Sequence, residues 1–501
     1  MWRWTCTLSG FSVGALFLVA APTYRLSSDF WIGAIVSTFT IFYTSHLLRQ
    51  RLRSHLPLCT IFFVLLVGTY AKFAAISYYV FSNREEELQL FLSSSSHLPA
   101  SALDPDNLSL ALLVSSLGMV GLAIATFLTT PPFRAQAVKP PIQPVPPLHR
   151  RSQTLFNVFL ASGFLLLLIT NYLAHRYDFG FMGREQARLP FRLTGIVSYL
   201  RTLPEILFIA VLFWAIAARW PRYVILGFLA LGSLVIAISL FAGGRGSFTM
   251  IIIYLGFFYA IYGGLRIRVV SVIFTLFIAS SLLRPLFENY RQIASRDNAG
   301  FDALDTVQAA RASLQGNYAD IGDQLIARAS NIVFRIIGYD SLLIFTSNSP
   351  PPFSSRRVID VFSGTLHVGR VLTDEYIGSN SGDVHTAAPS LMGTCYYLAG
   401  MNGVVVGVCI FGLLMQSFYF YVLRITFWLQ ATVLVKIATV TFANSSEGNF
   451  VTFIKDNLVW IIFILALEKI CRWTWNRGTI RSLRSNVGMA VLPGSSQQQQ
   501  Q

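Results

Sequence analysis

The chain has 501 residues, of which 54% are hydrophobic and only 12% are charged, and its mean hydropathy is +0.57. A soluble fold of this length cannot bury so much apolar surface, so the composition excludes a soluble globular protein and indicates lipid as the main solvent. The net charge of +15 is typical of cytoplasmic loops that face anionic headgroups, and nucleic acid is not an expected partner.

Apolar segments long enough to cross roughly 30 Å of hydrocarbon, about 17 to 25 residues each, predict transmembrane helices. In chain order they are 7–24, 30–48, 58–81, 108–130, 154–174, 202–218, 223–242, 247–264, 268–286, 398–422, 427–444 and 453–471. The expected fold class is therefore an all-α polytopic membrane protein with about twelve spans. Nine spans fall in residues 1–286 and three in residues 398–471.

Short basic loops set the orientation, because Arg and Lys concentrate on the cytoplasmic side of a membrane. These segments are RQRLRSH at 49–55, the Pro-rich stretch at 131–151, RWPR at 219–222, LRIR at 265–268, Arg424 and the basic tail that starts at 472. All of them fall on one side, so both termini are predicted to be cytoplasmic. The tail, 472–501, ends in QQQQQ and is predicted to be disordered. The first apolar segment is predicted to be an uncleaved helix rather than a signal peptide.

Two loops on the opposite, non-cytoplasmic side are rich in arginine. The loop at 175–201 has three arginines at four-residue spacing, which would form one cationic stripe on a helix: Arg184, Arg188 and Arg192. The longest loop, 287–397, carries eight arginines, among them Arg291 and Arg311. Arginine on the non-cytoplasmic side is contrary to the general preference of Arg and Lys for cytoplasmic loops, although this preference does not hold for long loops. These arginines either recognise phosphate with their planar guanidinium groups or form a solvated, headgroup-facing surface.

The long loop is predicted to be structured rather than disordered. Apolar residues recur at helical spacing in 303–315 and 321–345, which predicts amphipathic helices that lie on the bundle or in the membrane interface. Three prolines at 350–352 end the second of these helices. From 353 to 390 the chain becomes polar and Gly-rich before it re-enters the membrane.

A glycine-rich hairpin, GGRGSF at 243–248, joins two predicted spans on the outer side. Gly244 and Gly246 permit a tight turn, and Arg245 stands between them near the N–H groups that begin the next helix. A helix N-terminus and a guanidinium both favour phosphate, so the hairpin has the outline of an anion site. The alternative is a glycine turn whose arginine reaches lipid phosphate.

Three further polar groups suggest chemistry near or inside the membrane. His385, with Asp383 beside it, precedes the last re-entry and can act as a base near neutral pH, although a lone surface histidine often has no such role. Lys72 and Lys436 lie within predicted spans, where a charge is costly and faces a partner or a polar cavity. They either line a substrate path or lie at a depth from which the ammonium group reaches the interface.

Several common sites are missing from the sequence. There is no Walker A motif, no HExxH and no GxSxG, and the five cysteines have no CxxC spacing. Neither a cofactor nor a metal is therefore expected. The first outward loop, 25–30, is also too short for the acidic catalytic element of glycosyltransferases that use dolichyl-phosphate sugars.

The pattern resembles the O-antigen polymerase (Wzy-like) and oligosaccharide repeat-unit polymerase families. The resemblance rests on FAGGRGSF at 241–248, the two arginine-rich outward loops and the segment HTAAPSLMGTCYYLAGMNGVVVG that leads into a late span. Arg245 matches the hairpin arginine of the family. Arg184 and Arg311 match its loop arginines, since each is followed by a glycine at the spacing Arg-x10-Gly (Gly195 and Gly322). His385 corresponds only in location to the ligase histidine, which favours a polymerase over a ligase.

The resemblance implies a fold like that of the integral-membrane (GT-C-like) glycosyltransferases and O-antigen ligases. It implies polymerisation of undecaprenyl-pyrophosphate-linked oligosaccharide repeat units at the periplasmic face of the bacterial inner membrane. Besides this substrate and membrane lipid, it implies a chain-length regulator (polysaccharide co-polymerase) as a partner. Residue by residue, it points to Arg245, Arg311 and His385 for catalysis. For substrate binding it points to Arg184, Arg188, Arg192, Arg291, Gly244 and Gly246.

Other functions remain open from the sequence. An O-antigen-ligase-type transferase would use the same donor and chemistry, and a lipid-linked oligosaccharide flippase would have a similar number of helices. The chain concentrates its arginines in long loops on one side, whereas a flippase is expected to have short loops and polar residues along several spans. The proton acceptor also stays open among His385, Asp297, Asp374 and Glu375.

Overall fold

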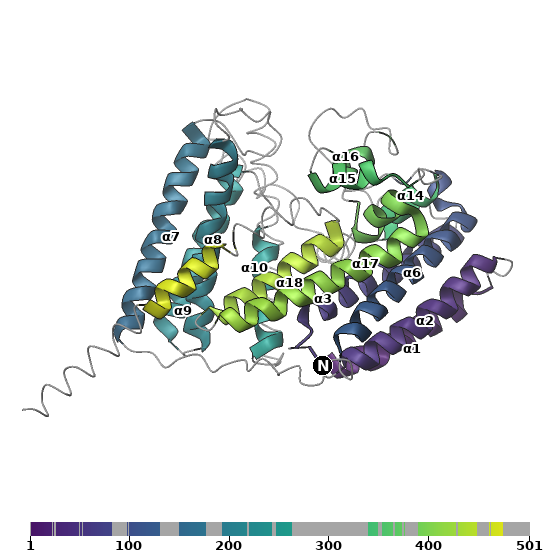
Figure 1. Cartoon of the computed structure of the whole chain (residues 1–501), viewed down its shortest axis with the longest axis horizontal. Coiled ribbons are helices and arrows are strands. Elements are labelled where there is room, and N and C mark those ends of the chain that lie inside the picture. Colours follow the sequence, from purple (N-terminus) through teal and green to yellow (C-terminus); the bar gives the residue numbers. More distant parts are fainter. Residues whose placement is uncertain are drawn as a thin grey trace, which may run out of the picture.

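The computed structural model describes the parts of the chain that carry most of its helices. These residues are 2–22, 24, 27–49, 51–52, 54–82, 98, 100–130, 150–176, 193–217, 220–242, 247–262, 339–348, 353–363, 366–372, 375, 389–426, 429–447, 460 and 462–473. Within these ranges every regular element is a helix (Figure 1).

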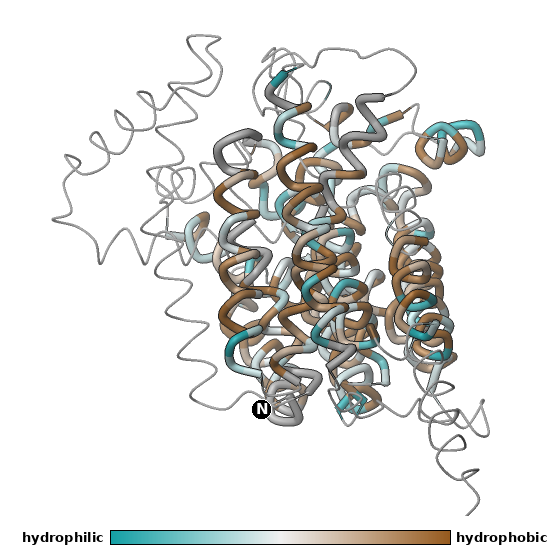
Figure 2. Tube along the Cα trace, turned by 90° about the vertical axis from the view of Figure 1, so that its left-hand side faces the viewer, coloured by the Kyte–Doolittle hydropathy of each residue, from teal (hydrophilic) through white to brown (hydrophobic). Residues whose placement is uncertain are grey.

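Six helices in the described ranges are long and apolar enough to cross a membrane. They are Ser28–Leu48, Leu56–Phe81, Pro105–Thr129, Gln153–Leu173, Pro221–Ile238 and Leu391–Ile425. Two shorter apolar helices, Leu8–Ala20 and Leu203–Ile216, accompany them. Hydrophobic residues run along most of the length of these helices (Figure 2). The chain is therefore a polytopic membrane protein, as its composition predicted.

Helices occupy most of the predicted spans. They are α1 (Trp2–Ala20), α2 (Ser28–Leu48), α3 (Leu56–Leu65) continued by a π-helical turn η1 (Leu66–Ala71) and α4 (Lys72–Phe81), α6 (Pro105–Thr129), α7 (Arg150–Arg176), α8 (Leu193–Ala217), α9 (Pro221–Ala242), α10 (Ser247–Tyr262), α17 (Leu391–Ile425) and α18 (Gln430–Glu447). The predicted span at 268–286 lies outside the described residues. Of the span predicted at 453–471, the described part is helical at 462–473. The total of twelve spans stays a prediction.

Helix α6 lies between α2 and α17, and glycines allow the close approach on both sides. A Cβ atom on Gly33 of α2 would lie 3.0 Å from the backbone nitrogen of Leu113 in α6. A Cβ atom on Gly121 of α6 would clash with the backbone oxygen of Val405 in α17. Small residues at such contacts let helix backbones approach closely in a membrane, where packing holds helices together.

Gly121→Ala is expected to lower the free energy of unfolding by about 1–3 kcal/mol, because the added methyl group would push two backbones apart. Gly232 in α9 provides a matched control, since a Cβ atom there meets nothing within 4 Å. Gly232→Ala should leave stability unchanged or raise it by about 0.5–1 kcal/mol, since glycine disfavours a helix interior. Thermal unfolding of the purified variants in detergent measures both effects. Equal midpoints for the two variants would contradict the close contact at Gly121.

Helix α17 begins earlier than predicted. It starts at Leu391 rather than near 398, with the Ser390 hydroxyl accepting a hydrogen bond from the Gly393 N–H at 3.1 Å. The backbone then leaves helical geometry at Ala399 and at Gly400, where φ is +61°. Glycine adopts this conformation readily because it has no Cβ atom. The eight residues before the break therefore form a separate, buried half-helix. Most of it was assigned from the sequence to the loop 287–397, because the residues just before it are polar.

The long outward loop also enters the bundle, which corrects the amphipathic surface helix predicted at 321–345. The described end of that segment lies in α14 (Tyr339–Thr346), and all eight residues are buried. This helix packs against α4, η1, α6 and α17. The predicted helix is present at this end of the segment, but its position was wrong, because its polar residues Tyr339, Asp340 and Ser341 find their partners inside the bundle.

The polar segment that follows α14 forms two short helices, which were not predicted from the sequence. These are α15 (Ser355–Ser363) and α16 (Val368–Val371). Together with α14 they lie at the end of the bundle away from the N-terminus (Figure 1). In α15, Val361 is buried, whereas Ile359 and Phe362 are exposed. The Arg357 guanidinium lies 5.3 Å from the centre of the Tyr397 ring in α17, which fastens α15 to the half-helix.

Helix α18 connects two groups of helices. One group contains α7, α8, α9 and α10, and the other contains α1, α2, α3, α4, α6, α14 and α17 (Figure 1). Among the described helices, α18 packs extensively against both, through α8 and α10 on one side and α3 and α17 on the other. Its start is fixed by Glu468, whose carboxylate accepts a hydrogen bond from the Leu429 N–H at 3.0 Å and pairs with Arg472 at 3.0 Å.

His55 lies in the turn between α2 and α3 and is buried there. Its Nε2 contacts the carbonyl oxygen of Thr129 at 3.3 Å, and its Nδ1 contacts the Ser54 hydroxyl at 2.9 Å. The ring is neutral when Nε2–H donates to Thr129 and Nδ1 accepts from Ser54. Burial is the main cause that lowers the pKa of His55 from 6.5 to about 4, and the nearby charge of Arg51 adds to it.

We expect the free energy of unfolding to fall as the pH drops from 6.5 toward 4. In this window the unfolded chain binds a proton at His55 and the folded chain does not, so the slope approaches roughly 1.4 kcal/mol per pH unit. Chemical unfolding in detergent at several pH values measures the slope. His55→Asn should flatten it, and an unchanged slope in that variant would show that other groups cause the effect.

Candidate functional site

The residues that the sequence assigned to catalysis and substrate binding lie outside the described ranges. They are Arg184, Arg188, Arg192, Gly244, Arg245, Gly246, Arg291, Arg311 and His385. Of the alternative proton acceptors, Glu375 is described and is exposed, whereas Asp297 and Asp374 fall outside. Lys72 and Lys436 are both described, and each has an acidic partner. These two pairs, unlike the Glu468–Arg472 pair at the start of α18, join residues that the sequence placed inside predicted spans to partners on other helices.

The first ion pair is sealed inside the bundle. The Lys72 Nζ lies 3.0 Å from Oδ1 of Asp340, and the two side chains are 0% and 2% exposed. The Lys72 ammonium has no partner in hydrogen-bond geometry among the described residues, so charge attraction to Asp340 holds it. Lys72 directly follows the π-helical turn η1. Such turns often occur at functional positions, because they change the direction in which the next side chains point.

Polar contacts hold the helix that carries Asp340 in place. The Tyr339 hydroxyl donates to the carbonyl oxygen of Leu108 in α6. The next residue but one, Ser341, donates to the Pro389 carbonyl at 2.9 Å and to the Ser390 hydroxyl at 2.8 Å. These bonds join α14 to α6 and to the start of α17, so Asp340 cannot move away from Lys72 unless several buried hydrogen bonds break.

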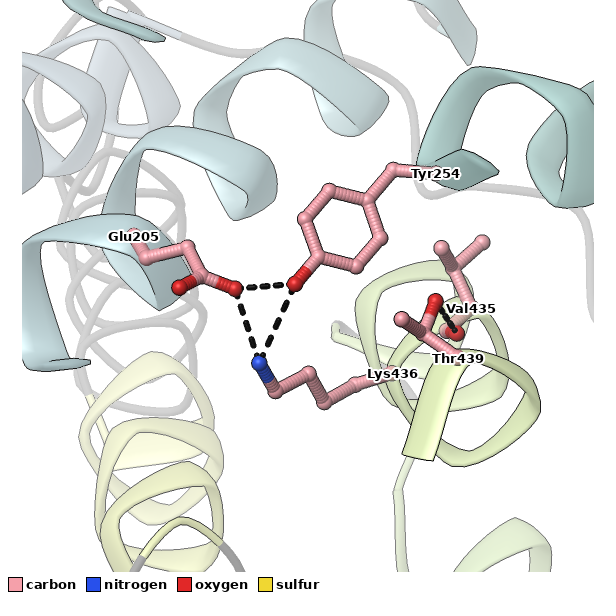
Figure 3. Close-up of polar contacts among 5 residues, drawn as sticks. All are labelled: Glu205, Tyr254, Val435, Lys436 and Thr439. Atoms are coloured by element: carbon pink, nitrogen blue, oxygen red, sulfur yellow. Dashed lines mark hydrogen bonds and ion pairs between the residues drawn. The ribbon is translucent and has the colours of Figure 1, made fainter. Parts of the chain in front are cut away.

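The second site is a triad of Glu205, Tyr254 and Lys436, contributed by α8, α10 and α18 (Figure 3). The Lys436 ammonium donates to Oε1 of Glu205 at 2.8 Å and to the Tyr254 oxygen at 3.2 Å. The Tyr254 hydroxyl donates to the same Oε1. The three groups form a closed triangle whose net charge is zero.

The two sites differ in access. The side chains of Lys436 and Glu205 are 15% and 22% exposed, whereas the Lys72–Asp340 pair is closed. Pairing reduces the cost of placing charge inside a membrane in both cases. A sealed pair can only stabilise the fold, because no ligand reaches it. The triad can also exchange hydrogen bonds with a ligand, and it is therefore the candidate functional site.

The sequence located one member of each site and missed the partners. Lys72 and Lys436 were identified because a lysine inside an apolar span is costly. The same reasoning applied to Glu205, an acidic residue within the predicted span 202–218, would have suggested a partner for Lys436. Asp340 could not be found in this way, because its segment was assigned to a loop. Tyr254 gave no signal, since tyrosine is common in membrane helices.

No group of three or more His, Cys, Asp or Glu side chains that could hold a metal comes together in the described part of the chain. Comparison with known proteins gives no match either to a protein-family model, to a curated protein or to a solved structure. The function is therefore inferred from the chain's own residues.

Proposed function

We propose that this protein is a metal-independent membrane glycosyltransferase that polymerises undecaprenyl-pyrophosphate-linked oligosaccharide repeat units. In this proposal it has about twelve spans in a GT-C-like arrangement in the bacterial inner membrane, with both termini in the cytoplasm. Its product is a surface polysaccharide or exopolysaccharide made at the periplasmic face. The resemblance to the O-antigen polymerase families motivates the proposal.

The observation that carries the proposal is the common end from which the arginine-rich connections leave the bundle. Helix α8 packs against both α7 and α9, and connections of 16 and 3 residues join the three helices, so we expect the chain to reverse direction at each one. The end of α7 at Arg176 and the end of α9 at Ala242 therefore lie on the same side. The connection after α7 carries Arg184, and the connection after α9 carries Arg245. Arginines in connections that leave the bundle on the same side can bind the same substrate molecule.

The expected chemistry uses these arginines as fixed charges. Guanidinium groups neutralise the charge that develops on a departing pyrophosphate, a task that needs neither a nucleotide nor a metal. The attacking sugar hydroxyl must lose a proton to an acceptor, for which His385 or one of the loop carboxylates is available. Because the substrate stays attached to its lipid, the reaction is expected at the membrane surface.

Incubation of the purified protein in liposomes with lipid-pyrophosphate oligosaccharide, without nucleotide or added metal, tests the proposal. A ladder of products longer by whole repeat units is the expected result. Transfer of one block to a different acceptor would instead indicate an O-antigen-ligase-type transferase. Complete absence of new glycosidic bonds would contradict both glycosyltransferase functions.

The triad favours a second candidate, a flippase for lipid-linked oligosaccharides. A transporter needs polar groups inside its spans, and Glu205 and Lys436 are accessible charged groups near the middle of α8 and α18. In this case the protein would move the intact substrate across liposomes and form no new bond. Appearance of the sugar on the opposite leaflet, measured by its oxidation with an impermeant reagent, distinguishes this candidate from the polymerase.

A further inference from the structure

The triad lies deep within its helices. Glu205 is the midpoint of α8, so at 1.5 Å per residue it lies about 18 Å from either helix end. Tyr254 is near the middle of α10, and Lys436 is the seventh of eighteen residues in α18. Tyr254 and Lys436 lie about 10 Å or more from either end of their predicted spans, 247–264 and 427–444. They place the triad at the depth of the hydrocarbon, although Glu205 is the third residue of the apolar stretch Leu203–Ile216 in α8.

At this depth, part of the triad is open. Glu205 and Lys436 keep 22% and 15% of their side-chain surface accessible, whereas the adjacent residues Ile206, Val435 and Ile437 are buried. An accessible surface inside a membrane faces either hydrocarbon or water. Contact of a carboxylate and an ammonium with hydrocarbon costs several kcal/mol. Water is therefore the favoured neighbour of the open surface.

The open surface also keeps hydrogen-bonding capacity. Both hydrogen bonds to the carboxylate end on Oε1 of Glu205. Within the described residues Oε2 has no hydrogen-bond partner, and the Lys436 ammonium uses two of its three donors. The neighbouring Thr439 does not compete, because its hydroxyl donates to the Val435 carbonyl at 2.9 Å (Figure 3). One acceptor and one donor are left side by side.

The helix next to the triad is irregular. Pro204 lies inside α8 directly before Glu205 and has no N–H group. The carbonyl of Leu200, one turn earlier, therefore loses its helical donor. In a membrane such a carbonyl is tolerated where a side chain or water satisfies it. This is a second feature of α8 that favours water at the level of Glu205.

From these features we propose that a water-filled recess reaches the triad of Glu205, Tyr254 and Lys436 inside the membrane and admits small hydrophilic solutes. The solutes that fit are uncharged or zwitterionic groups with a donor next to an acceptor, because the triad itself is neutral and offers one of each. Solutes with a net charge would bring that charge into the membrane interior. The recess is expected in the polymerase and in the flippase alike, so its test is independent of the proposed function.

Thiol accessibility tests the recess with the sealed pair as a matched control. The test variant combines Glu205→Cys with Lys436→Met, and the control variant combines Asp340→Cys with Lys72→Met. Each removes both charges, so neither leaves an unpaired charge in the membrane. The probe is a methanethiosulfonate that carries a glucosyl group, which is uncharged and too hydrophilic to cross bilayers readily. The cysteine thiolate forms a disulfide with its sulfur, and methanesulfinate leaves. Unsubstituted protein, whose five cysteines are buried or half-buried, gives the background rate.

We expect the cysteine at position 205 to react at least tenfold faster than the cysteine at position 340, which should stay at the background rate. Equal rates would overturn the proposal. Reaction at position 205 only with N-ethylmaleimide, which enters lipid, would also overturn it, since the side chain would then face hydrocarbon. The reciprocal variant, Lys436→Cys with Glu205→Gln, replaces the first if that one does not purify as a single species. Applying the probe from one side of oriented vesicles shows to which face the recess opens.

Discussion

Replacing Lys72 by Met is expected to lower the free energy of unfolding by about 3–5 kcal/mol, the largest loss of stability we expect from a single substitution in this protein. The change removes the positive charge that lies 3.0 Å from the Asp340 carboxyl group in a closed interior, where the Asp340 side chain is 2% exposed. The hydrogen bonds of Tyr339 and Ser341 prevent α14 from carrying the carboxylate to water. Thermal unfolding and the yield of folded protein in detergent measure the loss.

A double substitution distinguishes the effect of the lost charge on stability from the effect of changed side-chain packing. Lys72→Met with Asp340→Leu removes both charges and keeps similar volumes, so it should recover most of the stability lost in the single variant. Lys436→Met is a second comparison, and its effect should be smaller, because Glu205 keeps its hydrogen bond from Tyr254 and is partly exposed. A double variant that is no more stable than Lys72→Met would mean that the ion pair is not the cause.

Substitution of Arg245 by Ala is expected to reduce glycan elongation by about 10²–10³-fold, the effect of removing one preorganised charge that stabilises a transition state. Arg184→Ala and Arg311→Ala should act in the same way if all three guanidinium groups hold the pyrophosphate. Lysine should restore little, because it cannot bind phosphate with two parallel hydrogen bonds. The ladder assay in liposomes measures the loss.

Helix α9 offers a matched control for this experiment. Arg222 lies in its first turn and is exposed, at the opposite end of the helix from Ala242, which Arg245 follows in the sequence. Arg222→Ala should leave elongation unchanged and show that loss of one surface arginine is harmless in itself. Normal product length in the Arg245, Arg184 and Arg311 variants would contradict the proposal that these arginines bind the pyrophosphate. Equal loss in Arg222→Ala would point to a general defect in folding.

The sequence predicted the helices well because crossing a membrane is a local requirement. An apolar run of sufficient length is visible without knowledge of its neighbours, so the ranges 30–48, 58–81 and 108–130 agree closely with the observed helices. The predicted and observed helices differ where tertiary contacts determine whether a helix forms and where it begins. The buried helix α14 is too short for a span, and the start of α17 at Leu391 depends on a Ser390 cap that hydropathy does not register.

The candidate site was predicted only in part, for a similar reason. The cost of one charge in lipid can be read at a single position, which singled out Lys72 and Lys436. Their partners lie far away in the sequence: Asp340 for Lys72 and Glu205 for Lys436. Pairing over such separations follows from the way in which the helices pack, and a single sequence does not contain that information. The arginine hypothesis stays a prediction, because its residues lie outside the described ranges.

The sealed Lys72–Asp340 pair depends on the number of residues in the π-helical turn η1. A π-turn holds one residue more than the α-helical turn it replaces, and such turns act as single-residue insertions. Deleting one residue from Leu66–Ala71 would leave a regular helix that still crosses the bilayer, but it would rotate Lys72 by about 100° about the helix axis. The ammonium would then point away from Asp340. A protein of unchanged hydropathy and composition would thus lose its buried charge pairing through register alone.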